Sequence, residues 1–211
     1  MYTKIRYCGR LRDISEIEVF ADEVEDLCRS HDWPYHRWRE DWSKPNSLKM
    51  NLEDGVIHAE GHAPLKGISF NPGAGHEMIW LTCTPDGVLN SLFTLHDPTF
   101  TADDREYPWS RVKARLDDAK TYAAICNLFR FVAGKYFDDF QVMEETGYWK
   151  HGDEALLEKY LEQRALRERQ FEEELSAIQS DETIDPEKKD RIILDLIKQW
   201  GESARESEAE N

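Results

Sequence analysis

Residues 78–84 read Met-Ile-Trp-Leu-Thr-Cys-Thr, and this short apolar run has the composition of a β-strand. Side chains alternate between the two faces of an extended backbone. The two faces would hold, in turn, Ile79, Leu81 and Cys83, and Met78, Trp80 and Thr82. Because both faces are largely apolar, we predict a central strand that is covered on each side.

Turn signals on either side of this run predict an antiparallel meander over residues 48–95. Gly, Pro, Asn and Asp gather at residues 53–55, 71–75 and 85–87, where tight turns need them. The segments between the turns are short and β-rich, and we expect strands at residues 56–60, 65–71, 78–84 and 88–95. A further strand is predicted at residues 110–115.

The flanking segments add two more strands and two helices. Residues 3–11 alternate with period 2, which predicts a strand with one buried face, and residues 140–145 alternate as well. Apolar residues recur at helical spacing from Asp13 to about His31, and again from residues 117–121 to Phe137. The predicted class is α+β: an antiparallel sheet of about five or six strands with two helices packed on one face, plus a C-terminal helical hairpin.

Composition changes near residue 152. Residues 153–211 have a net charge of −9 in 59 residues, and only three of the 24 aromatic residues lie there. Large apolar side chains build a core, so we predict a core domain at 1–152, a charged helical extension at 153–204 and a disordered tail at 205–211. The extension reads as two helices, over residues 153–179 and from Asp185 with Pro186 in its first position. An apolar stripe on these helices predicts a protein partner or self-association.

Overall charge and hydropathy exclude several classes of protein. The chain has 211 residues and a net charge of −16, which would repel a phosphate backbone, so we expect no nucleic-acid partner. No apolar run approaches the ~20 residues that span a bilayer, and the N-terminus lacks a secretory pattern. We therefore expect a cytoplasmic protein without a membrane partner. Its four cysteines lack metal-binding spacing and are predicted to be reduced, buried thiols: Cys8, Cys28, Cys83 and Cys126.

The segment from His58 to His62 is the local pattern that most strongly suggests catalysis. On a strand, His58, Glu60 and His62 would share a face, and two imidazoles with a carboxylate can form an open metal site. This pattern predicts a small metal-dependent hydrolase. The alternative is the polar outer face of a hairpin, which needs no metal, and we expect no bound cofactor.

Five other residues are candidates for binding a ligand or a partner. Arg6, Arg10 and Arg12 would share one face of the first strand, and arginine binds carboxylates and phosphates through two parallel hydrogen bonds. Trp38 lies in an aromatic-rich segment, residues 31–42, that we interpret either as a recognition loop or as a loop folded over the core. Trp149 lies in a Gly-flanked turn, residues 147–153, that either lines a cleft or leads into a helix capped by Asp153.

These features favour a non-enzymatic binding or protein-interaction module. One alternative is the metal-dependent hydrolase that uses His58, Glu60 and His62. Another is an acidic inhibitor or immunity-type protein, because a net charge of −16 would speed encounter with a basic partner.

Overall fold

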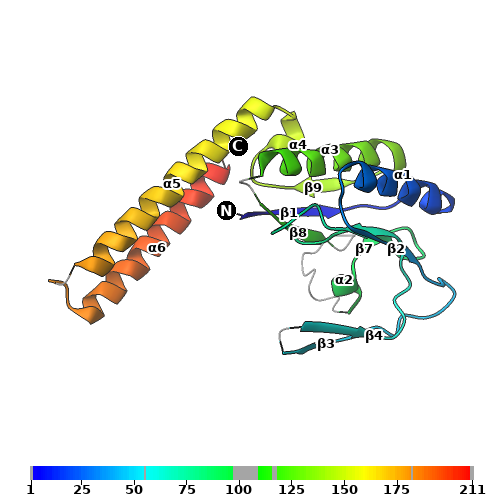
Figure 1. Cartoon of the computed structure of the whole chain (residues 1–211), viewed down its shortest axis with the longest axis horizontal. Helices are drawn as coiled ribbons and strands as arrows, with labels where there is room; N and C mark the ends of the chain where they lie inside the picture. Colours follow the sequence, from blue (N-terminus) through cyan, green and yellow to red (C-terminus); the bar gives the residue numbers. More distant parts are fainter. Residues whose placement is uncertain (1, 55, 97–108, 116–117, 182, 210–211) are drawn as a thin grey trace. The chain divides into compact units, whose positions relative to one another are not determined.

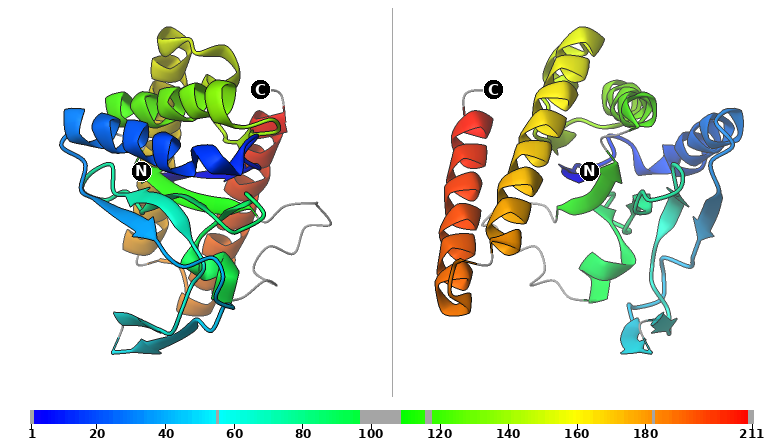
Figure 2. Two further views of the ribbon diagram at one scale, coloured as in Figure 1. Left: turned by 90° about the vertical axis from the view of Figure 1, so that its right-hand side faces the viewer. Right: turned by 60° about the vertical axis from the view of Figure 1, so that its left-hand side comes forward.

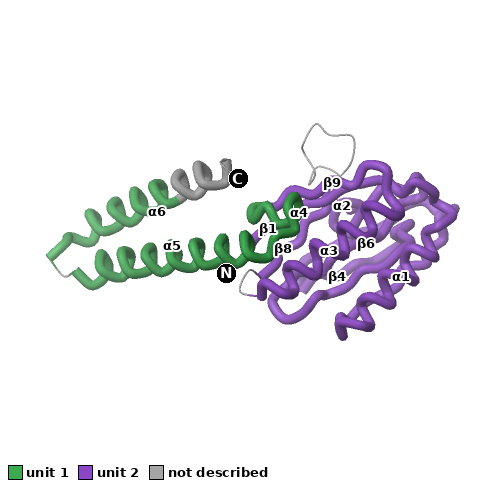
Figure 3. The backbone as a smooth tube through the Cα atoms, turned by 90° about the horizontal axis from the view of Figure 1, so that it is seen from above, with its two compact units in different colours: residues 1, 145–211 green, residues 2–144 purple. Residues whose placement is uncertain are grey.

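The computed structural model describes residues 2–54, 56–96, 109–115, 118–181 and 183–209. The chain divides into two compact units, which Figure 3 distinguishes by colour: a body of residues 2–144 and a C-terminal unit of residues 145–211. The predicted α+β class is confirmed, with antiparallel sheets and a C-terminal helical pair. No described helix is long and apolar enough to cross a membrane.

The described residues of the body form three antiparallel sheets, rather than the single sheet of about five or six strands that the sequence predicted (Figure 1). A three-stranded sheet has the order β8-β1-β9, formed by Ser110–Arg115, Tyr2–Cys8 and Gln141–Met143. A four-stranded sheet has the order β2-β5-β6-β7, formed by Tyr35–Arg39, Lys66–Phe70, Ile79–Cys83 and Leu89–Asn90. A separate hairpin pairs β3 with β4, which are Lys49–Glu53 and Val56–Glu60.

Strand β6 confirms the prediction made from residues 78–84. All five of its residues are buried, and it lies between β5 and β7 in the four-stranded sheet. Strand β1 shows the predicted alternation, since Thr3, Ile5 and Tyr7 are buried while Lys4 and Arg6 are exposed. Apolar burial of alternate residues fixes the register of such a strand.

The side chain of Tyr7 joins the two larger sheets. Its hydroxyl donates to the carbonyl oxygen of Trp80 at 3.0 Å and accepts from the Trp80 amide at 2.8 Å. Beyond Cys8 the backbone changes partners, because the Leu89 amide donates to Gly9 O at 2.9 Å. Strand β1 therefore ends at Cys8, and the prediction that one strand continues to residue 11 is wrong.

Two helices lie on the same side of the sheets, as predicted (Figures 1 and 2). They are α1, Ile17–Ser30, preceded by a 3-10 turn over Ile14–Glu16, and α3, Ala119–Tyr136. The Phe129 ring of α3 packs 4.8 Å from that of Tyr7, and Phe20 of α1 packs 5.2 Å from Tyr136. The core therefore lies between these helices and the sheets. The four cysteines are buried and form no disulfide bond, as predicted.

Two further local predictions in the body are wrong. Residues 35–39 form strand β2 within the segment predicted to be a loop, because cross-strand pairing with β5 satisfies their backbone. The strand predicted at 88–95 is instead the two-residue β7 followed by helix α2, Leu92–His96. Ser91 and Thr94 exchange hydrogen bonds at the start of this helix, which favours a helical turn over an extended chain.

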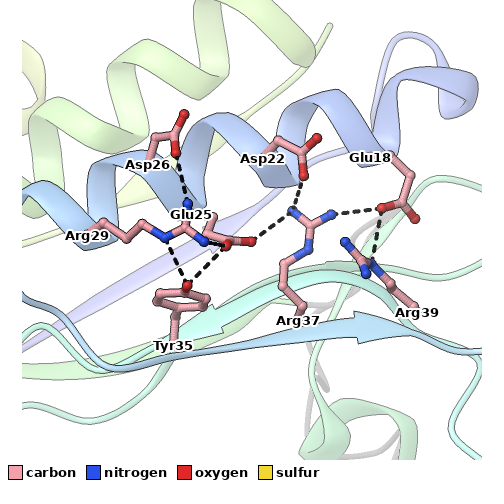
Figure 4. Close-up of polar contacts among 8 residues, drawn as sticks. All are labelled: Glu18, Asp22, Glu25, Asp26, Arg29, Tyr35, Arg37 and Arg39. Atoms are coloured by element: carbon pink, nitrogen blue, oxygen red, sulfur yellow. Dashed lines mark hydrogen bonds and ion pairs between the residues drawn. The ribbon is translucent and has the colours of Figure 1, made fainter.

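Strand β2 is held against α1 by an ion-pair cluster, which Figure 4 shows. The Arg37 side chain is only 11% exposed, and it lies 2.7 Å from Glu18, 3.1 Å from Asp22 and 3.8 Å from Glu25. One guanidinium thus faces three carboxylates on successive turns of the helix. Because Arg37 alternates with Trp38, the Trp38 side chain points to the opposite face of the sheet.

The C-terminal unit consists of the short helix α4, Tyr148–His151, and two long helices, α5, Glu154–Ser180, and α6, Pro186–Ala209. Asp153 caps α5 by accepting from the amides of Ala155 and Leu156, and Pro186 begins α6, both as predicted. The rings of Phe171 and Trp200 pack 5.6 Å apart between the two long helices. Helix α6 continues past residue 204, so the predicted disordered tail overlaps it, while residues 210–211 lie outside the described residues.

Candidate ligand-binding site

One face of the four-stranded sheet carries a row of aromatic side chains. The register places Trp38 opposite Gly67 and Trp80 opposite Ser69, on the face turned away from α1. The Trp38 ring lies 5.4 Å from the Trp80 ring, and its Nε1 donates to Ser69 Oγ at 3.0 Å. Trp38 is therefore fixed within a sheet, and is not part of a recognition loop.

Gly67 allows β5 to approach β6 closely beside this row. Its φ of +126° is one that side-chain-bearing residues rarely adopt. A Cβ at this position would lie 2.4 Å from the carbonyl oxygen of Leu81. The position opposite Trp38 therefore requires glycine for both conformational and steric reasons.

A buried polar network fixes helix α2 next to Trp80. The Ser91 amide donates to Thr94 Oγ1 at 2.8 Å, and Thr94 Oγ1 in turn donates to Asn90 Oδ1 at 3.0 Å. Thr82 Oγ1 donates to the Asn90 carbonyl at 2.5 Å. Buried hydroxyls that are hydrogen-bonded in this way hold the backbone in one conformation. They place Phe93 edge-on to Trp80, with ring centroids 6.3 Å apart at 87°.

These elements surround a cavity of about 460 Å³, which we call the aromatic cleft. Its wall is formed by five apolar side chains, Ile57, Met78, Trp80, Phe93 and Trp109. Sites for small organic molecules have volumes of about 300–1,000 Å³ and mostly apolar walls with a few polar groups. The aromatic cleft meets both conditions.

Three of the wall residues are also exposed to solvent. Ile57 is 50% exposed, Met78 42% and Phe93 41%. Apolar side chains that gather around a cavity without being buried are typical of binding sites. The wall therefore offers apolar surface that a ligand could cover.

Two charged residues, Glu77 and Arg111, border the cleft. The Glu77 carboxylate accepts from the Lys113 amide at 2.8 Å, and the Glu77 amide donates to the Lys113 carbonyl at 3.0 Å. Glu77 is thus held against β8 by two backbone contacts. Arg111 lies on β8 directly opposite Arg6 of β1.

Buried thiols and a buried phenol near the core are not suited to nucleophilic chemistry. Desolvation by burial raises the pKa of Cys28 and of Cys126 to about 12, and it raises the pKa of Cys83 as well. Burial also raises the pKa of Tyr7, and its contact with the Trp80 backbone offsets this only in part. These groups stay protonated at neutral pH, so the cysteines act as small apolar side chains.

The three candidate arginines do not lie on one face of a strand. Only Arg6 belongs to β1, because the strand ends at Cys8. The Arg10 amide donates to Asp139 Oδ1 at 3.1 Å, and Arg12 Nε lies 2.8 Å from Asp138 Oδ1. The three are therefore separated by the change of strand partner after Cys8.

The proposed metal triad is not assembled as the sequence pattern suggested. His58 and Glu60 lie on the exposed strand β4, and His62 follows its end. The His62 ring contacts the Asp41 carbonyl through Nε2 at 2.9 Å and Glu40 through Nδ1 at 3.2 Å, so both nitrogens already have partners. Among the described residues, no group of three His, Cys, Asp or Glu side chains could hold a metal ion.

Trp149 lies in the C-terminal unit, on helix α4. This unit has a smaller cavity of about 210 Å³ between α4 and the start of α5, bordered by Tyr148, His151 and Tyr160. Trp149 is not among the residues that border it. The prediction that residues 147–153 lead into a helix capped by Asp153 is confirmed.

Sequence reasoning missed Phe93, Trp109 and Arg111 as parts of a site. The available signal was the second apolar face of residues 78–84, where Met78 and Trp80 had no assigned covering element. Comparison of the chain with protein-family models, with curated proteins and with solved structures finds no match to any of them.

Proposed function

We propose that the body is a binding module, and that the aromatic cleft takes a small organic molecule with an apolar body. The observation that carries this proposal is the cavity of about 460 Å³ between Trp80, Phe93 and Trp109. Its size favours a small molecule over a protein surface. The rigid polar network beneath α2 favours a cleft that exists before the ligand arrives, which lowers the entropic cost of binding.

A binding role fits the cleft better than a catalytic one. The hydroxyls of Ser91 and Thr94, which border the cavity, are hydrogen-bonded to their own helix turn and to Asn90. A nucleophilic hydroxyl would instead be placed beside a general base such as histidine. Within the described lining of the cleft, no histidine contributes.

A neutral fluorescent dye tests the proposal. N-phenyl-1-naphthylamine fluoresces strongly only in an apolar environment, and we expect it to bind in a saturable manner at one molecule per chain. Phe93→Ala should weaken binding roughly tenfold, because it removes an aromatic wall. Phe131→Ala is the matched control, since Phe131 is 42% exposed on α3 and does not border the cleft.

Two results would contradict the proposal. One is the absence of saturable dye binding by the folded protein. The other is an equal loss of binding in the Phe93 and Phe131 variants, which would place the dye elsewhere. Thermal unfolding of each variant, followed by circular dichroism, checks that the fold is retained.

A further inference from the structure

The three-stranded sheet brings four cations together beside the aromatic cleft. The register of β1 with β8 places Arg6 opposite Arg111 and Lys4 opposite Lys113, and all four side chains are exposed. Side chains directly opposite each other in an antiparallel pair have Cβ atoms about 4.5–5.5 Å apart. We call these four residues the basic face.

Like charges in this arrangement destabilise the sheet unless anions offset them. Elsewhere in the body, Arg37 faces three carboxylates, and Arg12 lies beside Asp138. Within the described part of the chain, Lys4 and Arg6 form no ion pair. This is unexpected in a chain with 43 acidic and 27 basic residues.

Arg111 belongs to both the basic face and the aromatic cleft. It lies opposite Arg6 in the pairing of β1 with β8, and it borders the cavity. A ligand in the cleft therefore has a guanidinium group within reach at the rim, with Arg6 directly across the strand pair. Glu77, the acid at the same rim, is held by the Lys113 amide on β8. Arginine binds oxyanions through two parallel hydrogen bonds, and these are stronger than hydrogen bonds between neutral groups.

We infer that the ligand of the aromatic cleft is an organic anion. Its apolar body occupies the cleft, and its oxyanion group, a carboxylate, sulfonate or phosphate, is bound by Arg111 and Arg6 at the rim. This inference rests on the proposed function, and it names the chemical class of the ligand. It also accounts for a cationic surface on a strongly acidic protein. The positive charge of the basic face attracts an anionic ligand that the net negative charge of the protein would otherwise repel.

A matched pair of dyes tests the inference on the full-length protein. 8-Anilinonaphthalene-1-sulfonate has the same ring framework as N-phenyl-1-naphthylamine and adds one sulfonate. We expect the anionic dye to bind roughly tenfold more tightly than the neutral dye, which corresponds to one charge-assisted interaction. Raising the salt concentration should weaken binding of the anionic dye and leave binding of the neutral dye unchanged.

Arginine variants locate the anion. Arg6→Gln and Arg111→Gln should each reduce affinity for the sulfonate dye at least threefold, and the double variant should bring it to the affinity of the neutral dye. The neutral dye should bind Arg6→Gln as it binds the wild type, since Arg6 does not border the cavity. Arg39→Gln is the control, since Arg39 is an exposed arginine on the opposite face of the four-stranded sheet.

The outcomes separate the two proposals. If the neutral dye binds but the sulfonate adds no affinity, or the arginine variants do not change the ratio, the inference is wrong and the proposed function stands. If neither dye binds, both are wrong. If the sulfonate dye binds Phe93→Ala as tightly as the wild type, the anion binds at a site that does not include the cleft. That result would contradict the inference that one ligand occupies both the cleft and the basic face. Far-ultraviolet circular dichroism of Arg6→Gln, which removes no ion pair among the described residues, guards against a folding defect.

Discussion

Helices α3 and α5 show how differently the two units of this chain are stabilised. Helix α3 of the body buries eight of its 18 residues, whereas α5 of the C-terminal unit buries one of its 27, Leu157. Burial of apolar surface is the main favourable contribution to folding, so the shorter helix contributes far more. Helix α5 depends more on polar interactions, such as its Asp153 cap and the contact at 2.6 Å of Arg164 with Glu145, which precedes the helix. Helix length is therefore a poor guide to where the stability of this protein resides.

The largest expected difference comes from removing one phenylalanine in each unit. Phe129→Ala should lower the free energy of unfolding of the body by about 3–5 kcal/mol, because its ring is fully buried. Phe171→Ala should cost about 1–2 kcal/mol, since Phe171 is half-buried against Trp200. Urea denaturation of both variants measures the difference. Equal losses would show that the C-terminal unit has a core comparable to that of the body.

A pair of glycine substitutions tests the tight packing of the body. Gly67→Ala should destabilise the protein by roughly 2–3 kcal/mol, because the residue has a φ of +126° and its Cβ would meet Leu81 O at 2.4 Å. Gly134→Ala, within α3, should raise stability by about 0.5–1 kcal/mol, because no atom lies within 4 Å of the added Cβ. Thermal unfolding compares the two. A neutral Gly67→Ala would mean that β5 and β6 can move apart beside Trp38.

Ion pairs in the two units should respond differently to removal of an arginine. Arg37→Gln should lower the stability of the body by about 1–2 kcal/mol, since it leaves three carboxylates on α1 without their cation. Arg164→Gln should cost about 1 kcal/mol or less and act on the C-terminal unit alone. Hydrogen exchange, read separately for α1 and α5, distinguishes the two. Loss of protection in α1 on mutation of Arg164 would contradict this separation.

The smallest expected effects come from the helix caps. Asp118 accepts from the Thr121 amide at 3.0 Å at the start of α3, and Asp153 caps α5 in the same way. Each replacement by alanine should cost about 1 kcal/mol at pH 7. Asp118→Ala should reduce the protection of backbone amides throughout the body, and Asp153→Ala should reduce it within α5 alone. Hydrogen exchange measures both.

The effect of Asp118 should also depend on pH. Burial alone would raise the pKa of Asp118, but the hydrogen bonds from Thr121 together lower it below its ordinary value. A carboxyl whose folded pKa is depressed stabilises the protein above its unfolded pKa of about 3.9, and this contribution is lost as the pH falls through the folded value. The difference between wild type and Asp118→Ala should therefore shrink below about pH 4. A constant difference down to pH 2 would contradict this role of the carboxylate.

Many helices and strands of the body could be predicted from local patterns, because interactions between residues close in sequence determine where they form. Residues 78–84 have two apolar faces, and β6 is buried on both. Asp13 and Asp118 in the body, like Asp153 in the C-terminal unit, cap helical segments because short acidic side chains reach backbone amides nearby. Strand β2 was missed, since its residues are mostly charged or aromatic and their strand conformation depends on pairing with β5, about thirty residues away.

The candidate site depended on long-range pairing and could not be predicted in the same way. Met78 and Trp80 were visible as an apolar face, but nothing local indicates that Phe93 and Trp109 meet them. The basic face likewise exists only because the register places Arg111 opposite Arg6. The nature of the protein partner and self-association through the C-terminal helices stay predictions.

The Tyr7 hydroxyl occupies two backbone groups of Trp80 that no described strand pairs with. Beyond the two-residue strand β7, the Trp80 amide and carbonyl would form an open strand edge, and such edges recruit strands from other molecules. The phenol occupies both groups without adding a further strand. Removing this one oxygen, as in Tyr7→Phe, would leave an unsatisfied donor and acceptor on β6, whose five residues are all buried. Its consequence would then appear as lost solubility during refolding, beyond any change in the stability of the folded monomer.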